Sequence, residues 1–97
     1  MKFERNSGKE RVNITEHGIT FEQASYVFAD PLALNTYDDE HSIEEDRWVL
    51  LGKSINEVLL VVVHTFKDDN NIEYVRIISA RKATNNEQQS YQRRCKK

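Results

Sequence analysis

The sequence is poor in cysteine, proline and glycine, with one, one and three of them in 97 residues. A single cysteine, Cys95, excludes an internal disulfide and a zinc site built from cysteines. No apolar run approaches the roughly 18 residues that span a membrane, and the first ten residues lack the apolar core of a signal peptide. We therefore expect a cytoplasmic protein without a membrane partner. The length predicts one domain over residues 1–97, with any functional site on a shallow face or a rim.

Several catalytic motifs are also missing. The sequence has no P-loop, no GxGxxG, no HExxH and no serine in an elbow motif. Asp38, Asp39 and His41 offer hard metal ligands without a defined spacing, so we expect neither a metal nor a cofactor. These absences do not exclude cleavage of a ribose-phosphate backbone by polar side chains that are scattered along the sequence. Such cleavage needs a group that takes the 2′-hydroxyl proton, cations for the developing charge, and an acid for the leaving oxygen.

Charge is distributed unevenly although the net charge is only -2. Residues 30–46 carry seven acidic and no basic side chains, whereas residues 81–97 carry six basic and one acidic side chain. Such asymmetry is typical of a chain that meets a polyanion or a charged partner at one end. Two ordinary solvated faces would give the same pattern, and both interpretations stay open.

Caps and apolar runs predict an α+β fold. Capping boxes at Ser7–Glu10 and Thr20–Gln23 predict two helices that form a helical hairpin around Gly18. Residues 2–5, 32–34 onward, 47–53, 58–66 and 72–80 read as strands of an antiparallel sheet, with 58–66 central and a polar loop at 67–71. Thr84 and Glu87 begin a C-terminal helix, which we expect to fray after Arg93 into a basic tail, 92–97. The helices should cover one sheet face and leave the other for function.

Arg76 is the most informative single position, because a charge in mid-strand needs water, a carboxylate or an anionic ligand. It could bind phosphate through its planar fork or pair with Glu73, Glu57 or an acid of residues 38–46. His64 could transfer protons or be satisfied by a backbone carbonyl. His41 could serve as an acid, a base or an ion-pair partner of Arg47. For His17, a helix C-terminal position is the stronger interpretation.

Three groups of residues follow one another in a distinctive order. They are Phe3-Glu4, Asn13, 16–18, 21–22 and 27–31; then His41-Ser42, 44–48 and 52–54; then 60–65, 76–84, Glu87 and Tyr91. With these segments the chain resembles the BrnT family, the toxin half of type II toxin–antitoxin pairs. The resemblance covers residues 3–91. The Arg-Ile-Ile-Ser-Ala-Arg string from Arg76 and the string from His41 to Trp48 are its most specific parts.

The resemblance implies a RelE-like twisted antiparallel sheet and a metal-independent ribonuclease that inhibits translation and growth. It also implies a BrnA-like antitoxin whose ribbon-helix-helix domain binds operator DNA, so that this chain meets DNA only through that partner. On matching positions it implies Arg76 and Arg81 for phosphate charge, His64 and His41 for proton transfer, and Tyr91 for orientation or base stacking. The expected RNA-binding residues are Arg47, Lys53, Ser79 and Lys82. The alternative is a non-catalytic module that docks a DNA-binding partner.

Overall fold

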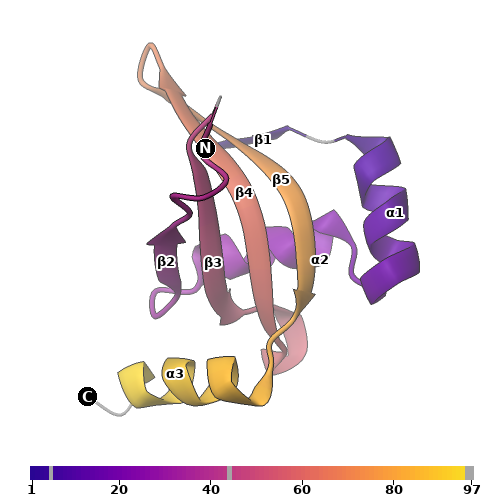
Figure 1. Ribbon diagram of the computed structural model, residues 1–97, viewed down its shortest axis with the longest axis vertical. Helices are drawn as coiled ribbons and strands as arrows, with labels where there is room; N and C mark the ends of the chain where they lie inside the picture. The colour runs from indigo at the N-terminus through magenta and orange to yellow at the C-terminus, as the bar shows by residue number, and fades with distance from the viewer. Residues whose placement is uncertain (5, 44, 96–97) are drawn as a thin grey trace.

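The computed structural model describes residues 1–4, 6–43 and 45–95 (Figure 1). Arg5 in the expected first strand, Glu44 in the acidic stretch and residues 96–97 of the basic tail lie outside this part of the chain. Five strands, three α-helices and two 3₁₀ turns follow one another in these described residues: β1 (Lys2–Glu4), α1 (Ser7–His17), α2 (Phe21–Ser25), η1 (Tyr26–Ala29), β2 (Leu34–Tyr37), β3 (Arg47–Lys53), η2 (Ile55–Glu57), β4 (Leu59–Asp69), β5 (Ile72–Lys82) and α3 (Asn85–Cys95).

The five strands form one sheet in the order β1-β5-β4-β3-β2. The predicted central strand is confirmed, because β4 is the middle strand and lies between β3 and β5. The expectation of a purely antiparallel sheet is wrong, since β1 pairs parallel to β5. Hairpins connect the other neighbours and fix their antiparallel direction, whereas most of the chain separates β1 from β5. The sheet is therefore mixed.

The hairpin between β4 and β5 is tighter than the predicted loop over 67–71. The strands extend to Asp69 and from Ile72, and only Asn70 and Asn71 form the turn. Their φ angles are 54° and 66°, the pair of positive values that a type I′ turn requires. Asparagine tolerates this left-handed region better than most residues, so the two asparagines specify the turn.

The first two helices begin where the caps place them, with one correction. Asn6, not Ser7, caps α1, because its side chain accepts a hydrogen bond from Lys9 N at 3.0 Å. Glu10 instead accepts from Phe21 N at 2.8 Å and so connects the start of α2 to α1. The Thr20–Gln23 capping box and the left-handed Gly18 C-cap are confirmed.

The expected helical hairpin is not confirmed. In Figure 1, α1 lies beside β5, whereas α2 crosses behind the sheet. The amide of Asn13 explains the position of α1: Nδ2 donates to Ala80 O at 2.9 Å and Oδ1 accepts from Ala80 N at 2.9 Å. β1 pairs only with residues 74–76 of β5, so no strand pairs with this edge of β5 at Ala80. The buried side chain of Asn13 satisfies the backbone groups of Ala80 instead.

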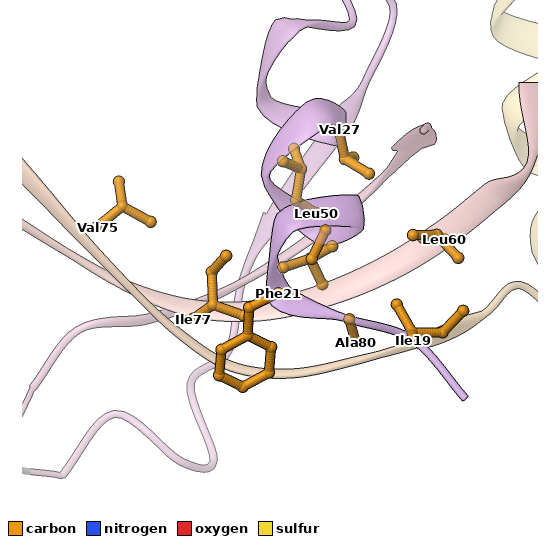
Figure 2. Packing of buried hydrophobic residues seen from close by; sticks show 10 residues of the cluster. Ile19, Phe21, Val27, Leu50, Leu60, Val75, Ile77 and Ala80 are labelled. Carbon is orange, nitrogen blue, oxygen red and sulfur yellow. The ribbon is translucent and has the colours of Figure 1, made fainter. Parts of the chain in front are cut away.

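Hydrophobic side chains pack on both faces of the sheet, so the expectation that helices cover one face is wrong. Figure 2 shows the larger cluster, in which Phe21 and Val27 of the α2–η1 segment lie among Leu50, Leu60 and the side chains of β5. A smaller cluster contains Leu51, Val61, Ala83 and Tyr91, which brings α3 onto the other face. Successive β4 residues point to opposite faces, and both sets are apolar at the start of the strand.

Candidate functional site

Three polar residues of neighbouring strands lie side by side on the sheet face that carries α3. They lie further along the strands than the smaller hydrophobic cluster. Arg47 of β3 pairs with Thr65 of β4, and Thr65 pairs with Arg76 of β5. Directly opposite residues share a face, so these three side chains form a row across the sheet. We call the surface formed by Arg47, Thr65 and Arg76 together with His41 and Glu45 of the neighbouring loop the Arg76 face.

A compact loop borders this surface. Ser42 Oγ donates to Asp38 O at 2.6 Å and accepts from Arg47 N at 2.9 Å, which fastens the loop to the start of β3. Asp38 N also donates to Arg47 O at 2.9 Å. His41 Nδ1 lies 2.9 Å from Asp38 Oδ2, so this carboxylate orients the imidazole.

Arg76 projects from β5 toward that loop. Its Nη2 donates to Glu45, which settles its partner among the acids proposed from the sequence. Its Nε is buried and has no hydrogen-bond partner among the described residues. A guanidinium with an unused donor in a polar recess is suited to an additional oxygen ligand such as phosphate.

Two hollows meet at Glu45 and Thr65. The smaller, of about 190 Å³, is also lined by Arg76, Lys67, Tyr74 and Glu4. The other, of about 270 Å³, is lined by His41, Arg47 and Ile43. Three cations, an imidazole and two carboxylates line these two adjoining hollows.

Sequence reasoning missed Glu45, Thr65 and Lys67 as members of a site. The alternation of side chains along β4 was the available signal, but it needed the register with β5.

A β-bulge determines which arginines of β5 lie on the sheet face that carries α3. Val63 pairs with Ser79 whereas the next residue, His64, pairs with Ile77, so Ile78 is the additional residue. Arg76 and Arg81 are five residues apart and would point to opposite faces of a regular strand. The bulge shifts the alternation, and both arginines then face the α3 side, opposite Thr65 and Val61 respectively.

Arg81 nevertheless lies apart from the Arg76 face. At roughly 3.3 Å per residue, five residues of β5 separate the two arginines by about 16 Å. Arg81 donates to both Glu87 oxygens, at 2.8 and 2.9 Å, and thereby fastens β5 to the first turn of α3. These hydrogen bonds lower the pKa of Glu87 to about 2 and raise the pKa of Arg81 above its ordinary value.

Tyr91, Lys53 and Lys82 also lie at the α3 end. Tyr91 is buried, and its hydroxyl donates to Asp30 Oδ2 at 2.6 Å. Burial alone would raise the pKa of Asp30, but hydrogen bonds from Lys53 N, Tyr91 and Leu32 N lower it. The three residues line a hollow of about 540 Å³ beside α3. It has two lysines but neither a histidine nor a free arginine, so we place the chemistry in the smaller hollows.

The structure does not bring His64 and Ser79 to the Arg76 face. His64 points to the opposite side of β4, where it is only 3% exposed and its ring lies 4.7 Å from that of Phe28. Burial lowers the pKa of His64, so the imidazole is neutral in this environment. Ser79 lines a separate hollow beside α1, together with Asn13 and Ile78. Of the sequence-predicted residues, Arg76, Arg47 and His41 come together.

Comparison with protein families agrees with the order of motifs along the chain. Residues 6–87 match the family described as the ribonuclease toxin, BrnT, of type II toxin–antitoxin systems. The chain belongs to the BrnT family. No curated protein matches it. This BrnT chain contains, within its described residues, no helix long and apolar enough to cross a membrane and no group of three or more metal-ligating side chains.

Proposed function

We propose that this BrnT protein is an endoribonuclease that cleaves RNA without a metal ion at the Arg76 face and thereby inhibits translation and growth. One observation carries the proposal: two adjoining hollows share the Glu45 carboxylate, and their linings contain Arg76 and Lys67 on one side and Arg47 and His41 on the other. Cleavage through the ribose 2′-hydroxyl needs these group types and no metal.

Arg76 binds the scissile phosphate in this proposal. Nη2 is bonded to Glu45 and Nε is an unused donor beside it, so the guanidinium has hydrogen-bonding capacity for a phosphate oxygen in addition to Glu45. Charge that develops on the phosphorane is then stabilised by a cation fixed on the sheet. Arg47 lies two strands away on β3 and contacts the neighbouring backbone phosphate.

His41 is the proton donor to the leaving oxygen. Its Nδ1 is engaged by Asp38, which leaves Nε2 for the substrate. The residues at the α3 end act differently. Arg81 and Tyr91 position α3 through Glu87 and Asp30, while Lys53 and Lys82 extend the basic path for RNA beyond the site.

A protein antitoxin follows from membership of a type II family. We propose that it is BrnA-like, with a ribbon-helix-helix domain that binds operator DNA, and that this chain meets DNA only through it. The antitoxin would inhibit cleavage by covering the Arg76 face. The competing function, a docking module without turnover, predicts the same complex but no RNA cleavage.

The test is cleavage of a labelled single-stranded RNA in EDTA, with and without ribosomes, by wild type and Arg76→Ala. Loss of one charge-stabilising donor typically lowers rates by 10²–10³-fold, and we expect roughly that loss. Arg11→Ala, which removes an exposed arginine from α1, is the matched control and should retain activity. Addition of the antitoxin should stop the reaction.

Folded wild type that binds the antitoxin but cleaves no RNA under either condition would establish the docking module instead. Cleavage that disappears in EDTA and returns with magnesium would overturn the metal-independent part of the proposal.

A further inference from the structure

We infer that Glu45 is the general base of the proposed ribonuclease reaction, the group that takes the proton from the attacking 2′-hydroxyl. The inference rests on the proposed function and adds to it the proton acceptor, which the proposed function does not name. It also gives a chemical reason for the acidic stretch over residues 38–46, which opposes RNA binding if it serves only as surface charge.

The position of Glu45 carries the argument. Glu45 lines both hollows, whereas Glu4, the other carboxylate there, lines only the smaller one. Its side chain is 53% exposed, so a substrate hydroxyl can reach a carboxylate oxygen. Arg76 binds the same side chain and therefore holds it next to the proposed phosphate position.

Glu45 lies two residues before Arg47, the first residue of β3, and Arg47 N donates to Ser42 Oγ at 2.9 Å. The start of β3 therefore keeps the backbone of Glu45 near the sheet that carries the proposed phosphate position.

The reaction balances with the groups present. Glu45 takes the proton as the O2′–H bond breaks, and O2′ forms a bond to phosphorus. The P–O5′ bond breaks, and the His41 imidazolium gives its proton to O5′. The products are a 2′,3′-cyclic phosphate and a 5′-hydroxyl, and proton exchange with water restores both side chains.

Charged and titratable groups face Glu45 from every element around it. They are Arg76 and Tyr74 of β5, Arg47 of β3, Lys67 of β4, Glu4 of β1 and His41 of the loop. The same environment is also compatible with a different role, in which Glu45 occupies the place beside Arg76 that a phosphate would take and must leave before RNA binds. The two roles predict opposite effects on the cleavage rate when the charge of Glu45 is removed.

The decisive variant is Glu45→Gln, which removes the charge and the basic site but keeps an oxygen that accepts from Arg76. We expect cleavage to fall by about 10²–10⁴-fold, the usual contribution of a general base. Glu40→Gln, an exposed change in the same acidic stretch, is the control for net charge and should match wild type.

A second measurement separates proton transfer from positioning. Glu45→Ala should regain part of its activity when formate is added, because a small carboxylate can enter the vacated space and accept the proton. Wild-type cleavage with an unchanged or faster Glu45→Gln variant would overturn the base assignment alone, and a faster variant would identify Glu45 as a gate. Absence of wild-type cleavage would instead overturn the proposed function.

Discussion

The type of a single residue on β4 does not reveal its role, because the role depends on the sheet face to which the side chain points. His64 has the residue type expected of a proton shuttle, but the alternation of the strand turns it toward Phe28 and away from Arg76. The sequence-based alternative, a histidine satisfied in the interior, describes its environment better. Arg76 was recognisable from sequence because a mid-strand charge needs a partner, whereas the identity of that partner, Glu45, depended on how the loop folds back.

Burial of His64 gives a pH-dependent contribution to stability. Its pKa is lowered from the model-compound value of 6.5 in the folded state, so the unfolded chain binds the proton more readily. The contribution is complete above about pH 6.5 and is lost as the pH falls below it. His64→Phe should therefore show a smaller loss of unfolding free energy between pH 8 and pH 5.5 than wild type.

Urea denaturation at the two pH values measures this difference. His17 and His41 are present in both proteins, so their effects cancel in the comparison. An equal loss of stability in both proteins would contradict the burial of a neutral imidazole at this position.

At the scale of elements, the local signals in the sequence were confirmed except for the Ser7–Glu10 capping box, whereas two features of strand pairing were not predicted. The Thr20–Gln23 and Thr84–Glu87 capping boxes and the Gly18 C-cap all occur in the structure, because each depends on a few neighbouring residues. The parallel β1 and the bulge at Ile78 depend on how distant strands pair. Without that bulge, sequence periodicity places Arg76 and Arg81 on opposite faces.

The Arg81–Glu87 pair is the main polar link between β5 and α3, since Arg81 makes two hydrogen bonds to one carboxylate. We expect Glu87→Gln to lower the unfolding free energy by about 1 kcal/mol, a value reduced for the partial exposure of both side chains. The pKa of Glu87 is lowered from 4.5 to about 2, so its stabilisation is present above pH 4.5 and is lost as the pH falls toward 2.

Thermal or urea unfolding of wild type and Glu87→Gln at pH 7 and pH 2.5 tests this account. The difference in unfolding free energy between the two proteins should be smaller at pH 2.5 than at pH 7. Glu16→Gln, on the exposed side of α1, serves as the control. A gap that stays constant, or grows in acid, would show that the ion pair does not hold α3.

On one sheet face of the whole molecule, the end that α3 covers is separate from the end where we propose that RNA is cleaved. At one end, α3 covers Leu51 and Val61 and is held by Tyr91 and Arg81. At the other end, α3 does not cover Arg47 and Arg76, which line hollows beside the acidic loop. The α+β class and the central strand were predictable from periodicity. The placement of helices on both faces was not, because the apolar face of α3 is small and depends on one buried tyrosine.

Val61 tests the position of the central strand. It is 2% exposed, and Val61→Asp buries an unpaired charge, which should destabilise the fold by roughly 3–5 kcal/mol and abolish soluble expression. Val58→Asp changes a valine that is 39% exposed and three residues away, so it should stay soluble. Soluble, folded Val61→Asp protein would show that β4 is misplaced.

The central claim is that RNA is cleaved on the Arg76 face and not on the opposite face that contains His64. Rates of RNA cleavage in EDTA by wild type, Arg76→Ala and His64→Phe, each confirmed as folded by circular dichroism, test it most directly. The account predicts a loss of about 10²–10³-fold for Arg76→Ala and a rate within a few-fold of wild type for His64→Phe. A large loss in His64→Phe with an active Arg76→Ala variant would contradict it.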